Sequence, residues 1–142
     1  MDFTTTFDTR DLIEYIDNLK ESIIDSYNFD QRTALGEDCI EAETWEEVPN
    51  EEAYESELDQ LRELLAFAEE LSVSPDYEYG ETVIPEDEFT DYVHELVEDC
   101  GYSIGDLPWW ISDAIDWNKV ADNVRMDYNE AKYQGITYLI RA

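Results

Sequence analysis

Basic residues are scarce in this chain of 142 residues, which has eight Lys and Arg against 38 Asp and Glu and a formal net charge of −30. A surface of this sign repels the phosphate backbone of nucleic acids and the anionic headgroups of membranes. The composition therefore excludes direct nucleic-acid binding and membrane-surface binding, and it favours a basic partner. Long apolar runs are also missing, so the sequence predicts no membrane span.

Cysteine is scarce as well, with Cys39 and Cys100 as the only two. Two cysteines are too few for a disulfide scaffold in a chain of this length. We therefore expect free thiols in a reducing compartment, which favours the cytoplasm.

Sequence signatures of catalysis are likewise absent. His94 is the one histidine, and no serine or cysteine lies in a nucleophile motif. The sequence has no EF-hand loop, no paired zinc-ligand spacing and no glycine-rich phosphate loop. Among 38 acids almost any catalytic carboxylate pair could be drawn by chance, so the sequence nominates none. We predict a protein that is not an enzyme and holds no metal or cofactor, with His94 on a helix surface.

Apolar residues are plentiful, because 43% of the chain is hydrophobic and includes ten Tyr, five Phe and four Trp. This content is enough for one core or two small ones, and it argues against a disordered acidic tail. The segment Ser72–Asp76 contains Pro75 and reads as a breaker. It divides the chain into a predicted acidic helical unit, residues 1–75, and a second unit, residues 76–142.

Hydrophobic periodicity predicts two helices in the first unit. The first spans residues 9–27, with Asp8 or Thr9 as N-cap, and the second spans about 51–72. Residues 28–50 predict a loop with at most a short element around Cys39 to Trp45. The inward positions are Leu12, Ile16, Leu19, Ile23 and Tyr27 in the first helix and Tyr54, Leu58, Leu61, Leu65 and Ala68 in the second.

For the second unit the sequence predicts both strands and helices. A strand at 81–84 leads into a helix from Pro85 to Cys100, which Gly101 closes. A short helical turn at 107–111, a helix capped by Asp116 and a terminal hairpin turning at Gln134-Gly135 follow. The fold class is therefore α+β, with a three-stranded antiparallel sheet packed on helices. We interpret Trp109, Trp110 and Trp117 as core residues, with a subunit or partner anchor as the alternative.

Acidic residues recur at helical spacing on the faces opposite the apolar stripes. The rows are Asp11, Glu14, Asp17, Glu21 and Asp25 in the first helix, Glu52, Glu55, Asp59 and Glu63 in the second, and Glu88, Asp91, Glu95 and Glu98 in the third. Such carboxylates lie roughly 5 Å apart along a helix, against about 3.4 Å between phosphates of one DNA strand.

Charge density decides whether these rows imitate a duplex. A charge of −30 spread over a globe of about 7,600 Å² gives one charge per roughly 250 Å², against about 110 Å² on a duplex. Residues 33–118 hold 27 acids and one base, Arg62, whereas residues 119–142 are nearly neutral. Mimicry therefore requires that the acidic segment gathers on one elongated face and that the C-terminal segment turns to the core or to a subunit contact.

Residues 76–142 carry a distinctive order of motifs. These are the series from Tyr79 to Tyr92 (YGETVIPEDEFTDY), Ile115-Asp116-Trp117 with Val120-Ala121, Met126-Asp127-Tyr128, and Gln134-Gly135-Ile136-Thr137-Tyr138. In this order the segment resembles the C-terminal part of the ArdA antirestriction proteins and their phage-borne relatives. The resemblance implies an acidic, elongated, usually dimeric mimic of duplex DNA that occupies the DNA groove of type I restriction-modification enzymes.

The resemblance carries over no catalytic residue. It assigns partner binding to the acids that match the strand and helix, namely Glu81, Glu86, Asp87, Glu88, Asp91, Glu95, Glu98 and Asp99. We thus expect an antirestriction DNA mimic in the cytoplasm of an infected or recipient bacterial host, with a homodimer implied. The alternatives are an anti-CRISPR or other inhibitor of a nucleic-acid-binding defence protein, and an acidic interaction protein that shields basic proteins without imitating DNA. A metal-dependent hydrolase would need several acids that converge in a cleft.

Overall fold

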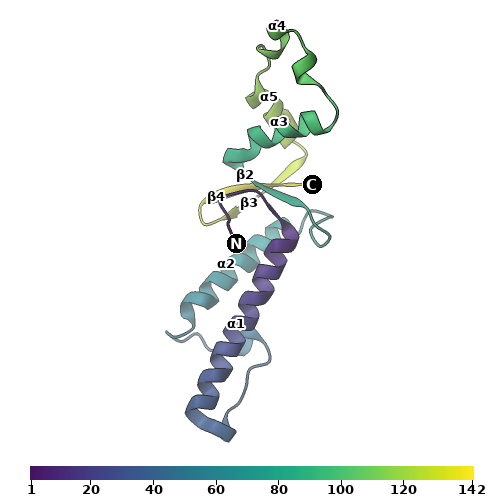
Figure 1. The fold of residues 1–142 in the computed structure, drawn as a ribbon. Coiled ribbons are helices and arrows are strands. Elements are labelled where there is room, and N and C mark those ends of the chain that lie inside the picture. Colours follow the sequence, from purple (N-terminus) through teal and green to yellow (C-terminus); the bar gives the residue numbers. More distant parts are fainter.

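One four-stranded antiparallel sheet lies at the centre of the structure, a computed structural model that describes all 142 residues. Its strands follow one another as β1 (Phe7–Asp8), β2 (Thr82–Pro85), β4 (Ile136–Arg141) and β3 (Tyr128–Tyr133). The helices α1 (Thr9–Leu35) and α2 (Glu55–Leu71) lie on one side of the sheet, and α3 (Phe89–Asp99) and α5 (Trp117–Arg125) lie on the other (Figure 1). The predicted α+β class is confirmed, with four strands in place of three.

The sheet separates two hydrophobic clusters. Val83 and Ile140 belong to the larger cluster, which α1 and α2 complete, whereas Ile84 and Leu139 belong to the smaller one beneath α3 and α5. Successive side chains of a strand point to opposite faces, so the two central strands supply both clusters. They read as continuous apolar runs because both of their faces are covered.

The strand β1 is the element that the sequence did not predict. Phe7 pairs with Val83 and Asp8 with Thr82. Thr9 adds two contacts, since its N–H donates to the Glu81 carbonyl at 2.9 Å and its hydroxyl accepts from the Glu81 N–H at 2.9 Å. A two-residue strand is too short for a periodic pattern, yet it fixes the start of α1 to the sheet.

The first helix begins as predicted and ends eight residues later than predicted. Asp8 is the N-cap and accepts from the Arg10 N–H at 2.8 Å, and the inward positions Leu12, Ile16 and Ile23 are buried. The helix continues beyond residue 27 to Leu35 and ends at Gly36, whose φ of 60° suits glycine. The apolar stripe stops before the helix does, which is why periodicity placed the end too early.

The predicted loop over residues 28–50 is therefore wrong in its first part. After α1 come two single 3-10 turns, η1 (Gly36–Asp38) and η2 (Trp45–Glu47). Asn28 is buried, and its side-chain amide donates to the Ala42 carbonyl at 3.0 Å and accepts from the Ala42 N–H at 2.7 Å. This pair of hydrogen bonds holds the returning segment against α1.

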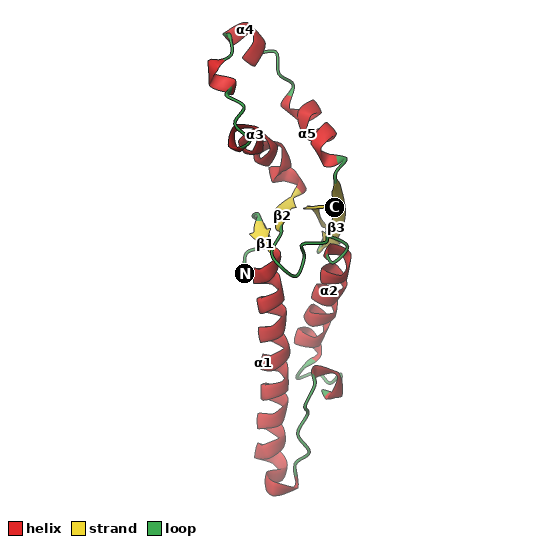
Figure 2. Ribbon diagram, turned by 90° about the vertical axis from the view of Figure 1, so that its right-hand side faces the viewer, coloured by secondary structure: helices red, strands yellow, loops and turns green.

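The second helix is shorter than the predicted 51–72 and runs antiparallel beside α1 (Figure 2). Its buried positions include the predicted Leu58 and Leu61, but Leu65 and Ala68 lie only at the rim of the core. Leu64, Phe67 and Leu71 are buried in addition, because α2 packs against β3 as well as α1.

The predicted third helix divides into two parts. Pro85 ends β2, the 3-10 turn η3 covers Glu86–Glu88, and only then does α3 begin. Gly101 closes α3 as predicted, with a φ of 90° and its N–H donating to the Glu98 carbonyl at 3.0 Å. The capping by Asp116 and the hairpin turn at Gln134-Gly135, both residues with positive φ, are confirmed.

Two of the three tryptophans assigned to the core are exposed. Trp109 and Trp110 lie in α4 (Trp109–Ser112) and are 74% and 62% accessible. This short helix lies at one end of the molecule, beyond α3 and α5 (Figure 1), and no other element packs extensively on it. Trp117 is half-buried, with its ring centroid 4.1 Å from that of His94.

The molecule is elongated. Its accessible surface is 9317 Å², whereas a compact chain of this mass exposes about 7,600 Å². The larger cluster joins Leu61 of the first half to Val83 and Tyr138 of the second. The two hydrophobic clusters thus lie on opposite faces of the sheet. The division of the chain into units 1–75 and 76–142 stays a prediction.

Replacing Asn28 by Ala should destabilise the fold by about 1–3 kcal/mol, because the buried N–H and C=O of Ala42 lose their partner. Urea unfolding followed by circular dichroism measures this change. Asn18→Ala, at an exposed position of the same helix, is the matched control and should change stability little. Equal stability of the two variants would show that the hydrogen bonds to Ala42 contribute nothing.

Candidate protein-binding face

The five predicted acids of α1 all lie exposed along one side of the helix. Glu14, Glu21 and Asp25 fall opposite the buried stripe of Leu12 and Ile23 at 100° per residue, and Asp11 lies about 100° from Leu12 at one edge of the row. Asp17 lies at the other edge of the row, where it lines a separate hollow with Lys20 and Tyr77. No salt bridge joins any of the five to a Lys or Arg. With a rise of 1.5 Å per residue, the row from Asp11 to Asp25 is about 21 Å long.

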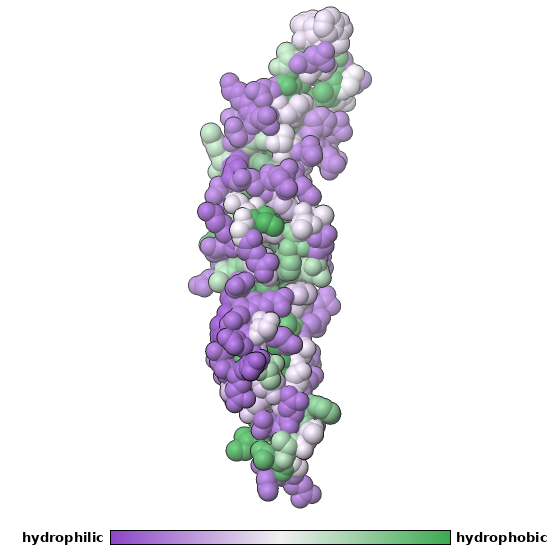
Figure 3. All heavy atoms as spheres, turned by 90° about the vertical axis from the view of Figure 1, so that its left-hand side faces the viewer, coloured by the Kyte–Doolittle hydropathy of each residue, from purple (hydrophilic) through white to green (hydrophobic).

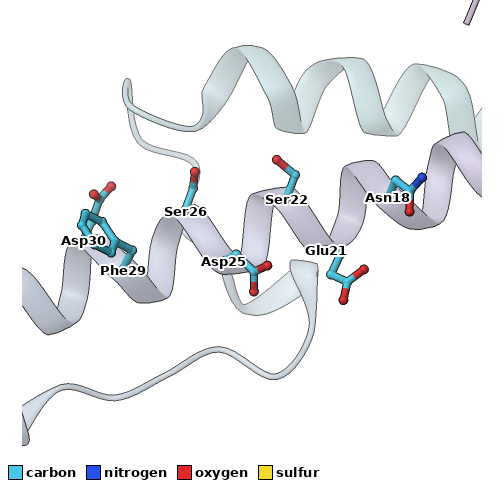
Figure 4. Close-up of a pocket in the computed structure, with 7 residues that line it drawn as sticks. All are labelled: Asn18, Glu21, Ser22, Asp25, Ser26, Phe29 and Asp30. Atoms are coloured by element: carbon cyan, nitrogen blue, oxygen red, sulfur yellow. The ribbon is translucent and has the colours of Figure 1, made fainter.

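Shallow hollows follow this row. One is lined by Asn18, Glu21, Ser22, Asp25, Ser26, Phe29 and Asp30. Figure 4 shows Glu21 and Asp25 projecting from the same side of α1, away from Ser22 and Ser26. A second hollow continues from Asn18 past Glu14 and Asp11 to Phe7. Both are open surface depressions, so they suit contact with another macromolecule better than capture of a small ligand.

The acids of α3 continue the same side of the molecule. A third hollow is lined by Thr6, Glu88, Asp91, Tyr92 and Glu95. Glu88 Oε2 accepts from the Thr6 N–H at 3.1 Å and from the Thr6 hydroxyl at 2.9 Å. Because Phe7 lines the second hollow, the N-terminal segment bridges the two rows of acids.

We call this surface the acidic face and define it by Asp11, Glu14, Glu21, Asp25, Glu88, Asp91 and Glu95. It joins helices on opposite sides of the sheet into one surface. Sequence patterns could not show this, since the bridge depends on β1 and on the contact of Thr6 with Glu88.

The acids of α2 lie on a different flank. The apolar stripes of α1 and α2 face each other, so the exposed Glu55, Asp59 and Glu63 point away from α1. Asp59 pairs with Arg62 at 3.4 Å, and Glu63 lines a hollow beside Lys132. Glu52 lies in the turn before α2 and not on the helix.

The predicted gathering of residues 33–118 on one face is therefore wrong. The row on α1 comes from outside that segment, and the row on α2 forms a second, separate flank. Figure 3 shows one flank of the molecule, on which hydrophilic surface runs along most of the length and is interrupted by apolar patches, some of them near each end.

Several acids assigned from the resemblance serve the fold itself. Glu86 pairs with Arg125 at 2.7 Å, and Glu81 is half-buried and accepts from the Thr82 N–H at 2.9 Å. Glu88 is half-buried against Thr6. The remaining members, Asp87, Asp91, Glu95, Glu98 and Asp99, are exposed and accept no side-chain hydrogen bond.

Two arginines pair with acids at the sheet. Arg125 of α5 bridges Glu86 and Glu130, and these hydrogen bonds raise the pKa of its guanidinium. Arg10 bonds Asp8 at 3.0 Å and lowers the pKa of that carboxyl. No salt bridge of the structure involves a residue of the acidic face.

Two acids near the acidic face were not predicted from the sequence. Asp2 lines the second hollow with Asp11, and a bond from Thr4 lowers its pKa. Asp30 lies on the side of α1 that faces α2, where it accepts from the Tyr54 hydroxyl at 2.7 Å. The helical period is sufficient to predict that Asp30 lies on another side of α1 than the row of acids. Only the fold of the N-terminal segment brings Asp2 close to that row.

No group of three or more His, Cys, Asp or Glu side chains is arranged to hold a metal ion. No helix is both long and apolar enough to cross a membrane. Comparison with protein-family models, with curated proteins and with solved structures finds no match for this chain.

The contact between Tyr54 and Asp30 should make stability depend on pH in the alkaline range. The hydrogen bond to Asp30 raises the pKa of Tyr54 from 10.0 to about 12. A raised folded-state pKa means that the contribution, about 1 kcal/mol for a bond to an exposed acid, is complete below pH 10 and lost as the pH rises through about 12.

Urea unfolding of the wild type and of Tyr54→Phe measures this dependence. The variant should be less stable at neutral pH, and the difference should shrink toward pH 12. Tyr79→Phe removes an exposed hydroxyl without a hydrogen bond and should match the wild type throughout. A difference that stays constant with pH would contradict the assignment.

Proposed function

We propose that this protein is a DNA mimic that inhibits a DNA-binding enzyme of bacterial host defence by occupying its basic DNA groove. The observation that carries the proposal is the acidic face, on which acids of α1 and α3 follow one side of an elongated molecule and none forms a salt bridge. The proposal rests on this face and not on the gathering of residues 33–118 that the sequence predicted. Grooves lined with Lys and Arg for a duplex attract such a surface.

The dimensions of α1 support imitation of a duplex. Its five acids recur on average every 5 Å or so over about 21 Å, which corresponds to roughly six base-pair steps of 3.4 Å. Packed helices are about 8–10 Å apart and each is about 10–12 Å wide, so the outer rows of α1 and α2 are separated by roughly 20 Å. This is about the diameter of a duplex.

Order distinguishes mimicry from mere shielding. An acidic protein that only solubilises or shields basic partners needs net charge and no particular arrangement. The rigid helix α1 instead fixes its carboxylates at regular intervals, because Leu12, Ile16 and Ile23 of the opposite stripe are buried in the core. The carboxylates therefore form a straight row, which favours a partner with a straight basic groove.

The target class follows from the resemblance of residues 76–142 to the ArdA antirestriction proteins. A type I restriction-modification enzyme in the cytoplasm of an infected or recipient bacterial cell is the first target to test. A guide-RNA effector of the CRISPR type would present a comparable basic channel. A panel of both enzymes separates these targets.

Purified protein should protect unmodified DNA from a type I enzyme and compete with a DNA duplex for it. Binding should weaken steeply as salt rises, because contacts between exposed charges are screened beyond about 8 Å at 0.15 M salt. Fluorescence competition over a salt series measures both effects. Failure to compete with DNA for either enzyme class, even at low salt, would contradict the proposal.

Neutralising four acids of the α1 row should weaken binding more than neutralising four scattered acids. Asp11→Asn, Glu14→Gln, Glu21→Gln and Asp25→Asn combined should cost about 2 kcal/mol, or roughly thirtyfold in Kd, since an exposed pair contributes up to about 1 kcal/mol.

The matched control combines four exposed acids outside the rows, Glu37→Gln, Glu43→Gln, Glu46→Gln and Asp122→Asn, and changes the net charge by the same amount. Both variants should unfold at wild-type denaturant concentrations or above. Equal losses of affinity would indicate that only net charge matters and would favour shielding over mimicry.

A further inference from the structure

One end of the molecule is apolar and aromatic. Trp109 and Trp110 of α4 are 74% and 62% exposed, and Tyr102 and Leu107 of the same projecting segment are 68% and 37% exposed. We call these four residues the apolar end. They lie beyond α3 and α5, at the opposite end from the tip of α1 (Figure 1). Large exposed aromatics at one place mark contact sites on soluble proteins.

The acids of α3 lead directly to this end. Asp91 and Glu98 are exposed and seven residues apart, nearly two full turns, so they lie on the same side of the helix. At the end of α3 the Gly101 N–H donates to the Glu98 carbonyl at 3.0 Å and the Tyr102 N–H donates to the Val97 carbonyl at 3.2 Å. These are the two bonds of a Schellman motif. They fix Tyr102 against the last turn of α3, which makes the apolar end continuous with the row of acids.

Charge alone leaves the acidic face at a disadvantage against DNA. The row on α1 offers one carboxylate per 5 Å or so, whereas a duplex offers one phosphate per roughly 1.7 Å of its axis. Over its surface of 9317 Å² the protein carries one net charge per about 310 Å², against about 110 Å² on a duplex. A basic groove therefore meets fewer charges on this protein than on DNA. A protein that displaces DNA needs a contact that DNA does not make.

We propose that the apolar end supplies this contact by binding an apolar surface of the target enzyme, beside the end of the groove that takes the acidic face. The inference rests on the function proposed above and adds a second surface of the same partner. Asp106 is the only charged side chain between residues 100 and 112, so a basic surface gains little from this segment. DNA at the same place presents phosphates, which an apolar surface does not accept.

The apolar end is large enough to matter for affinity. A large aromatic side chain buries roughly 150–250 Å², so three that are about two-thirds exposed offer about 400 Å². This is about half of the roughly 800 Å² that one partner contributes to a standard interface. Trp and Tyr are also the residues that most often dominate binding energy at interfaces. Loss of both indoles should therefore raise Kd about a hundredfold.

Salt separates this contact from the acidic face. Competition binding is measured with whichever enzyme of the panel the wild type binds, at about 0.01 M and about 0.15 M salt, between which the screening length falls from about 30 Å to about 8 Å. Trp109→Ser with Trp110→Ser should raise Kd by about the same factor at both concentrations, because apolar contacts are not screened. The fourfold variant of the α1 row should instead approach the wild type as salt rises.

Two other exposed apolar residues provide the matched control. Ile40→Ser with Val73→Ser, at positions 83% and 62% exposed outside the apolar end, should bind as the wild type does. Both double variants should unfold at the wild-type urea concentration, since the replaced side chains are exposed.

The outcomes distinguish the two proposals. A wild type that binds no enzyme of the panel would remove the proposed function and this inference with it. A wild type that binds, with a Kd that Trp109→Ser and Trp110→Ser leave unchanged or raise only at low salt, would overturn this inference alone. A double variant that changes the mass of the free protein and not its Kd for the enzyme would likewise overturn it, because another copy of the chain would then cover the apolar end.

Discussion

Repulsion among carboxylates is the constraint that the rest of this structure must satisfy. Two unit charges 5 Å apart in water repel by about 0.8 kcal/mol, and each α1 acid has a neighbour at about that distance. Salt limits the range of this repulsion to about 8 Å, so adjacent acids dominate. A helix that carries such a row needs a strongly packed opposite face, and α1 has one in Leu12, Ile16 and Ile23.

The central strands supply that packing on both sides of the sheet. Tyr138 and Ile140 of β4 join the cluster under α1 and α2, while Leu139 joins the cluster under α3 and α5. A single short strand thus anchors both helical layers. The arrangement allows helices at both ends of a long molecule to share one rigid centre, which keeps their acids at fixed positions relative to each other.

Two of the eight Lys and Arg residues pair with acids at this centre. Arg125 ties α5 to η3 and β3 through Glu86 and Glu130, and Arg10 lies beside the cap of α1. An elongated shape also keeps like charges farther apart than a sphere of equal mass would. The elongated shape thus lowers the repulsion that a surface with many carboxylates and few cations creates.

Periodicity and capping chemistry were sufficient to predict most of the local structure. The stripe from Leu12 to Ile23, the cap Asp116, the stop at Gly101 and the turn at Gln134-Gly135 depend on neighbours within a few residues, so the sequence alone determined them. For the first helix the sequence offered Asp8 or Thr9, and the structure has Asp8 as the cap. The exposure of most acids in the rows followed for the same reason, because they lie away from an apolar stripe, whereas Glu88 is half-buried against Thr6.

Tertiary structure decided which of these elements meet. The continuation of α1 to Leu35, the strand β1 and the bridge from Thr6 to Glu88 depend on partners distant in sequence, and so does the separation of the α2 row from the acidic face. Trp109 and Trp110 show the same limit, because hydrophobicity predicts burial only where another element is present to cover it. Local patterns specify what a segment can form, whereas contacts across the chain specify what lies beside it.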